Sequence, residues 1–180
     1  MTFRERYEKE VAPKLKEELG EKSTMAVPRI VKVVLNSGTG TQRDPRLPDI
    51  VADTFERITG QRPVRTKARK SIAAFKLREG NPVGVVVTLR GRRMWDFLEK
   101  FTVVTLPRVR DFRGLSDKIV DTQGNCSIGF REHVMFPEIE PDAVDQLHGL
   151  QITIVTTAGG RERGLALFRA LGFPFTQRTK

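Results

Sequence analysis

The chain has 180 residues, of which 38% are hydrophobic and 30% are charged, a composition that is typical of globular proteins and excludes the disordered class. Its 32 Lys and Arg against 22 Asp and Glu give a net charge of +10, which indicates a phosphate-rich partner but is also compatible with solubility alone. Without an apolar run of about 18 residues or a signal-like N-terminus, we expect a soluble cytoplasmic protein that is neither secreted nor bound to a membrane.

The first 22 residues are predicted to form an amphipathic helix. They contain six cations and six acids, a mixed-sign pattern that is typical of a solvated helix face. Apolar side chains recur at four-residue spacing at Phe3, Tyr7, Val11, Leu15 and Leu19. Pro13 lacks a backbone donor, so we expect the helix to bend or break there.

Alternating patterns predict two long strands. In residues 28–37, Val31, Val33 and Leu35 point to one side, and Ile30, Lys32, Val34 and Asn36 to the other. In residues 83–91, Val85, Val87 and Leu89 point to one side, and Gly84, Val86, Thr88 and Arg90 to the other. Residues 63–67 and 150–157 are predicted to supply further strands. Each long strand thus has one core face and one mixed face.

Helical spacing is found between and after these strands, in residues 48–59, 92–101 and 161–172. Trp95 and Phe101 are expected to lie in the core, and Gly172 is expected to end the last helix. The order of elements predicts a single α+β domain over residues 1–180. Its sheet is largely antiparallel, with helices packed on one face and the other face left available to RNA.

The positive charge is concentrated in residues 61–93. This segment contains ten cations and a single acid, Glu79. A charged segment is often only a solvated face, but like charges without counter-charges repel and destabilise a compact fold. We therefore interpret the segment as a polyanion-binding surface.

The available sheet face carries Lys32, Asn36, Thr88 and Arg90. Cations can contact phosphates, and an amide or a hydroxyl can bond a base edge or a 2′-hydroxyl. Without the neighbouring basic segment, an ordinary solvated sheet face would explain these residues equally well.

The connection between two strands, residues 67–82, is too long for a tight hairpin turn. It holds Arg69, Lys70, Lys76 and Arg78 with Ile72 and Phe75 between them. Phe75 could stack on a base or sugar, or could anchor the loop on the protein, and the sequence favours neither.

No motif supports catalysis, a cofactor or a metal site. The Gly38–Gly40 pair lacks the rest of a nucleotide-binding fingerprint and is better explained by a turn. Cys126, in a predicted hairpin, is interpreted as structural, and His133 and His148 as surface or capping residues. One cysteine and two histidines make a poor zinc site. We therefore expect a protein that is not an enzyme.

The chain resembles the bacterial large-subunit ribosomal proteins of the L5 family, which bind 5S rRNA. The resemblance covers essentially the whole chain. It is carried by MAVPRI at 25–30, N-x-G-x-G at 36–40, GQRPVRTKARKSIAAFKLREGNPVGVVVTLRG at 60–91, FLEK at 97–100, LPRVRDFRGL at 106–115, FPEI at 136–139, ITIVTTA at 152–158 and LGFPF at 171–175.

The resemblance implies the same α+β fold, with an N-terminal half at about 25–81 and a C-terminal half at about 84–176 that are not independent. It implies 5S rRNA contacts at Lys32, Asn36, Gln61, Thr88 and Arg90. It places Arg69, Lys70, Ser71, Phe75 and Lys76 in a loop that contacts the P-site tRNA. Arg65, Lys67, Arg78 and Arg92 are expected as further RNA contacts.

The partners implied by the resemblance are 5S rRNA, 23S rRNA, the P-site tRNA, other ribosomal proteins of the central protuberance and a small-subunit head protein at the intersubunit bridge. Two local departures are expected to have limited effects: Cys126 stands where an aromatic is usual, and GGRERGLALF at 159–168 lacks a capping Thr and acids. The alternatives are an RNA-processing enzyme and a free-standing RNA-binding or chaperone module.

Overall fold

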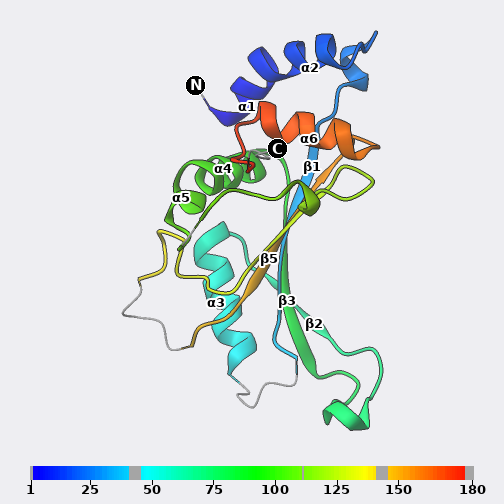
Figure 1. Cartoon of the computed structure of the whole chain (residues 1–180). Coiled ribbons are helices and arrows are strands. Elements are labelled where there is room, and N and C mark those ends of the chain that lie inside the picture. Colours follow the sequence, from blue (N-terminus) through cyan, green and yellow to red (C-terminus); the bar gives the residue numbers. More distant parts are fainter. Residues whose placement is uncertain (1, 41–45, 111, 141–145, 177–180) are drawn as a thin grey trace. The chain divides into compact units, whose positions relative to one another are not determined.

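The computed structural model of the chain describes residues 2–40, 46–110, 112–140 and 146–176 (Figure 1). The α-helices are α1 (Phe3–Arg6), α2 (Ala12–Glu18), α3 (Leu47–Thr59), α4 (Gly91–Lys100), α5 (Leu106–Arg108) and α6 (Arg161–Ala170). The strands are β1 (Ile30–Gly38), β2 (Val64–Lys67), β3 (Pro82–Leu89), β4 (Cys126–Phe130) and β5 (Leu150–Thr156). Within the described ranges, no helix has the length and apolar character needed to cross a membrane.

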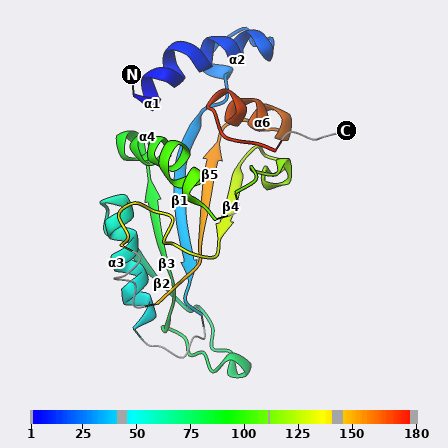
Figure 2. The same ribbon diagram turned by 60° about the vertical axis from the view of Figure 1, so that its left-hand side comes forward.

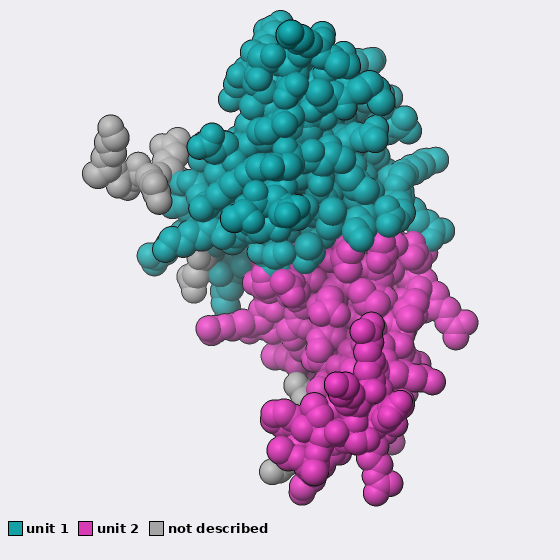
Figure 3. Space-filling model, turned by 90° about the vertical axis from the view of Figure 1, so that its right-hand side faces the viewer, with its two compact units in different colours: residues 1–33, 90–128, 153–180 teal, residues 34–89, 129–152 magenta. Residues whose placement is uncertain are grey.

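The five strands form one antiparallel sheet in the order β2-β3-β1-β5-β4. With the helices around it, this arrangement confirms the predicted α+β fold (Figures 1 and 2). The chain divides into two compact units (Figure 3). Unit 1 comprises residues 1–33, 90–128 and 153–180, and unit 2 comprises residues 34–89 and 129–152. That the whole chain is one domain stays a prediction.

The predicted N-terminal helix is present in unit 1 and is interrupted where the sequence indicates. Thr2 caps α1 together with Glu5 in a capping box. A π-helical segment, Tyr7–Val11, then leads into α2, in which Pro13 lies in the first turn, where a missing N–H removes no helical hydrogen bond. The Tyr7 hydroxyl donates to the Pro28 carbonyl oxygen at 2.9 Å, which fixes this helix on the chain that leads to β1.

The second helical pattern begins as predicted with α4 and continues past it. A π-helical segment, Phe101–Thr105, connects α4 to α5. Phe101 is fully buried, as predicted. Trp95 is only partly buried, and its ring stacks on Tyr7 at 5.4 Å between centroids. It therefore covers the edge of the core in unit 1 and does not lie within it.

The last helix, α6, begins at Arg161 after the N-cap Gly160, whose backbone is extended and which offers no side-chain cap, as the sequence indicated. It ends at Ala170, and the amide of Gly172 bonds back to the Arg169 carbonyl at 3.0 Å. Gly172 has a φ of +87°, which confirms it as the end of the helix.

Strand β4 lies in a region for which the sequence predicted a hairpin within an irregular segment. The Asp121 carboxylate accepts hydrogen bonds from the amides of Gln123 and Asn125 at 2.9 and 2.8 Å and so shapes the turn before the strand. Cys126 is fully buried, and this burial raises the pKa of its thiol to about 12. A thiol that stays protonated agrees with the structural interpretation.

The alternation predicted for β3 is confirmed, and that for β1 is confirmed in part. Val85, Val87 and Leu89 are all buried. In β1, Val33 and Leu35 are buried, but Val31 is 37% exposed and Ile30 is 6% exposed, the reverse of the prediction. Ile30 and Val31 belong to the part of β1 that lies in unit 1, whereas Leu35 belongs to unit 2.

The prediction that His133 and His148 lie at the surface or at helix caps is wrong. Both side chains are buried, and their rings stack at 3.9 Å between centroids and 9° between planes. The segment around them has no regular periodicity, which is why no local pattern signalled their burial. The His148 amide donates to His133 Nδ1 at 3.4 Å, and the His148 ring meets Phe55 of α3 edge-on at 6.4 Å.

Burial lowers the pKa of both imidazoles, and the adjacent His133 lowers that of His148 further, to about 4 from an ordinary value of 6.5. The unfolded chain therefore binds a proton at His148 at a higher pH than the folded chain does. Stability is unaffected by this group above pH 6.5 and falls as the pH decreases from there towards 4.

We predict that lowering the pH from 7.5 to 5.0 costs the protein about 2 kcal/mol of unfolding free energy through His148. In denaturant unfolding at both pH values, His148→Leu should show a pH difference that is smaller by this amount. Carboxylates titrate equally in both proteins, so they cancel in the comparison. An unchanged pH difference in the variant would contradict the assignment.

Candidate nucleic-acid interface

In unit 2 one face of the sheet is covered and the other is open. Helix α3 lies on one side of the strands (Figure 1), where its buried side chains Val51, Phe55 and Ile58 face the core. The segment that holds the stacked histidines lies on this side too, since Ser37 Oγ donates to the Gly149 carbonyl oxygen at 2.6 Å. The covered face is thus the one that carries Leu35 and Ser37.

The opposite face carries the side chains that alternate with these core residues. They are Val34 and Asn36 of β1 and Val86 and Thr88 of β3, and we call this set the open face. Asn36 is exposed and the other three are partly buried. Neither the Asn36 amide nor the Thr88 hydroxyl has a hydrogen-bond partner within the described chain. Both groups are therefore available to a ligand.

The end of α3 places Gln61 beside the open face. Gly60 adopts the left-handed conformation at φ +63°. Its amide donates to the Glu56 carbonyl oxygen at 2.8 Å and so ends the helix. The Thr59 hydroxyl accepts from the Gln61 amide at 3.3 Å, and Gln61 Nε2 donates to the Thr88 carbonyl oxygen at 3.2 Å. The helix end thereby brings Gln61 and Thr88 together.

Strand β2 extends the open face at the edge of the sheet. In its antiparallel register with β3, Val64 lies opposite Val86 and Thr66 lies opposite Gly84. The side chains of Val64 and Thr66 therefore point to the open side. Val64 is 64% exposed. Sequence reasoning missed it because four residues are too few to display an alternation.

Arg65, a predicted RNA contact, lies on the other side of the sheet. It is opposite the buried Val85, and its guanidinium pairs with Asp49 of α3 at 2.7 Å. Both side chains are more than half exposed, so the pair contributes little to stability and leaves Arg65 able to exchange partners. The structure separates Arg65 from Asn36 and Thr88.

The two remaining predicted 5S contacts belong to unit 1. Lys32 lies two residues before Val34 in β1, on the same side of the strand, and is partly buried. Arg90 is exposed and has an extended backbone directly before α4. The site residues that the structure brings together in unit 2 are Asn36, Gln61 and Thr88.

Most cations of the basic segment have no counter-ion. In the part of the chain that the structure describes, two of the ten cations between residues 61 and 93 pair with a carboxylate: Arg65, and Arg92 with Asp96 at 3.7 Å. The others are Arg62, Lys67, Arg69, Lys70, Lys76, Arg78, Arg90 and Arg93. Their unbalanced charge would attract a polyanion.

The loop between β2 and β3 carries Phe75 at its tip, in a 3-10 turn over Ala73–Phe75. Phe75 is 59% exposed, so most of its surface is not packed against the protein. Ser71 Oγ accepts from the Glu79 amide at 2.9 Å and so helps to hold the loop in shape.

The described residues show no constellation suited to catalysis. They contain no group of three or more His, Cys, Asp or Glu side chains that could hold a metal ion. The amides of Thr39 and Gly40 both donate to the Val83 carbonyl oxygen, at 3.0 and 3.1 Å, so they close the sheet and do not form a phosphate loop. These features define an α+β protein with an open polar sheet face and an unpaired basic loop.

Comparison with known proteins gives the family. Residues 23–78 match the family described as Ribosomal protein L5, and residues 82–175 match the C-terminal region of the same ribosomal family. The chain is 52% identical over 174 residues to the large ribosomal subunit protein uL5 of Halothermothrix orenii, covering 96% of this chain and 97% of that protein. It is 54% identical over 175 residues to the protein of the same name from Desulfatibacillum aliphaticivorans, covering 97% and 98%.

A third relative, from Streptomyces griseus, bears the same name and is 53% identical over 173 residues, 96% of this chain and 94% of that protein. The chain therefore belongs to the ribosomal protein L5 family, and the resemblance stated from the sequence is confirmed. The family consists of non-enzymatic structural proteins, which confirms the prediction that the chain is not an enzyme.

The open face depends on a close approach at Gly84. A Cβ at this position would lie 3.0 Å from both the Ser37 carbonyl oxygen and Thr66 Oγ1, so β1 would have to shift. We predict that Gly84→Ala lowers the unfolding free energy by about 1–3 kcal/mol, as measured in denaturant.

Gly38→Ala is the matched control, because Gly38 is on the neighbouring strand and a Cβ there meets nothing within 4 Å. Its effect should stay within about 0.5 kcal/mol. Equal losses in the two variants would show that the close approach does not matter.

Proposed function

We propose that the chain, as a structural constituent of the large ribosomal subunit in the cytoplasm, binds 5S rRNA and helps to attach it to the central protuberance. The names of relatives that are about half identical to it and span nearly its whole length support the ribosomal assignment. The sequence resemblance supports 5S rRNA as the partner.

The observation that carries the proposal is the open face of unit 2. Asn36 and Thr88 present an amide and a hydroxyl with no partner in the described protein, and the Gln61 side chain lies beside them. Such groups suit base edges and 2′-hydroxyls, which fix the register of an RNA. The exposed Val64 and the partly buried Val86 opposite it offer apolar surface to ribose rings.

In this proposal phosphate contacts supply most of the affinity. Lys32 and Arg90, which belong to unit 1, are further contacts to 5S rRNA in this proposal. Lys67, Arg78 and Arg92, with Arg65 after exchange from Asp49, contact further phosphates of 5S or 23S rRNA. These contacts require no chemistry, only a rigid surface with charge placed along the RNA backbone.

The loop forms a second contact in the same proposal. Arg69 and Lys70 are exposed near its base and Phe75 and Lys76 at its tip, while Ser71 supports its backbone. We assign this tip to the P-site tRNA. The remaining partners in the proposal are other proteins of the central protuberance and a small-subunit head protein at the intersubunit bridge.

We predict that Asn36→Ala weakens the binding of 5S rRNA about tenfold, the value of one good hydrogen-bonded contact, whereas Lys70→Ala leaves it nearly unchanged. Filter binding of purified protein to 5S rRNA measures both. Asn36 is exposed and Lys70 lies in a surface loop, so neither change should unfold the protein. Equal losses would contradict the separation of the open face from the loop.

The dependence on salt tests whether the interface is electrostatic. If about six phosphates are neutralised, the logarithm of the 5S rRNA affinity should fall with the logarithm of salt concentration at a slope of roughly −4 to −5. A slope near zero would contradict the proposed function.

A further inference from the structure

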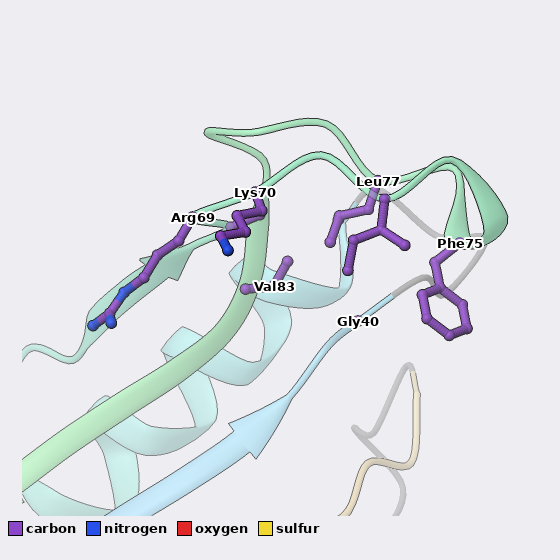
Figure 4. A pocket seen from close by; sticks show the side chains of 8 residues that line it. Gly40, Arg69, Lys70, Phe75, Leu77 and Val83 are labelled. Carbon is purple, nitrogen blue, oxygen red and sulfur yellow. The ribbon is translucent and has the colours of Figure 1, made fainter.

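An apolar hollow lies against the loop between β2 and β3. It is lined by Gly40, Ala68, Arg69, Lys70, Ile72, Phe75, Leu77 and Val83, all in unit 2 (Figure 4). Phe75 is 59% and Ile72 42% exposed. In the close-up, Phe75 and Leu77 lie at one end of the hollow, Lys70 lies towards the other, and Arg69 extends away from it.

The exposed position of Phe75 is imposed by a hydrogen-bonded turn. Ile72 and Leu77 exchange two backbone hydrogen bonds, at 2.9 and 3.1 Å, and enclose the 3-10 turn that carries Phe75. Lys76 completes this turn in the left-handed conformation at φ +51°, which is uncommon for a residue with a side chain. The ring therefore projects from a defined backbone.

The base of the loop is fixed as well. The Ala68 amide donates to the Asn81 carbonyl oxygen at 2.8 Å, and the Gly80 amide donates to the Ala68 carbonyl oxygen at 3.0 Å. A hollow held at both ends needs little ordering when a ligand enters, which favours binding.

Charge decides which ligand fits this hollow. Arg69 and Lys70 have no acidic partner in the described chain, and Glu79 is the single acid in residues 61–93. An apolar ligand alone would leave this charge unbalanced. The surface that lines the hollow is also far smaller than the roughly 800 Å² that each partner of a stable protein interface buries. A nucleotide combines a flat apolar base with an anionic phosphate and so matches both features.

We infer that the hollow binds one unpaired nucleobase of an RNA, stacked on the Phe75 ring, with the adjoining phosphate at Lys70 and the next phosphate within reach of Arg69. This inference rests on the proposed function, in which the loop contacts RNA, and adds to it the form of RNA that is recognised. Contact with a duplex backbone needs only the cations. An exposed aromatic ring on a fixed turn gains a role only when a base is free to stack.

The test uses the full-length protein and a short single-stranded RNA that contains one 2-aminopurine, whose fluorescence is quenched by stacking. The wild type should quench this fluorescence on binding, and the same sequence in a duplex should show no change. Phe75→Ala should bind the single strand about tenfold more weakly and lose the quenching, as expected for one lost base–aromatic stack. Phe75→Tyr should retain both.

Val103→Ala is the control, because Val103 is 65% exposed and lies outside the loop, so the change removes exposed apolar surface but no aromatic ring. It should behave as the wild type does. Unchanged quenching in Phe75→Ala would overturn the inference, as would failure of the wild-type protein to bind the single strand while it binds 5S rRNA.

Binding of 5S rRNA by the same variants separates the two proposals. Phe75→Ala should bind 5S rRNA as the wild type does. If the wild type itself does not bind 5S rRNA, the proposed function fails, whatever the quenching shows. If Phe75→Ala loses binding to 5S rRNA and to the single strand together, the loop is part of the 5S interface, and the inference of a separate base-binding site is overturned.

Discussion

The packing of α3 on one face of the sheet is the interaction on which the candidate interface depends. Val51, Phe55 and Ile58 of the helix are buried on the side of Val85, Val87 and Leu89 of β3. Each such side chain contributes about 1.5–3 kcal/mol when it is fully buried. Because side chains alternate along a strand, this one-sided burial also decides that Asn36 and Thr88 face outwards. The same contacts that stabilise unit 2 thus present its polar groups.

The second constraint is electrostatic. Eight cations between residues 61 and 93 have no acidic partner among the described residues, and their mutual repulsion disfavours the compact state. The fold tolerates this because the cations lie at the surface, where water screens them. Binding of a phosphate backbone would relieve the repulsion, so the protein and a polyanion would stabilise each other. The stability of the folded protein should therefore be higher with a bound polyanion than without one.

Sequence patterns predicted those parts of the fold in which local periodicity and tertiary packing agree. The alternation in β3 indicated the correct buried face, and the helical spacing of residues 48–59 indicated α3, because each element packs on one side only. The prediction for β1 failed at its first two residues, where Ile30 is buried and Val31 is exposed. No local pattern carries that information.

Other features depend on contacts that are distant in sequence. His133 and His148 are buried where their rings stack on each other and His148 meets Phe55 of α3 edge-on, and nothing in the local composition indicates this. The placement of Arg65 next to Asp49 follows from the register of β2 with β3. Gln61 was selected only through the family resemblance, and no local pattern indicated its hydrogen bond to the Thr88 carbonyl oxygen.

The most direct measurement is site-specific photo-crosslinking in intact large ribosomal subunits, followed by sequencing of the attached RNA. A photoreactive residue is placed at Asn36 on the open face or at Asp53 on the exposed side of α3 in the same unit. The account predicts that position 36 crosslinks to 5S rRNA and that position 53 does not. A 5S rRNA crosslink from position 53 with none from position 36 would contradict it.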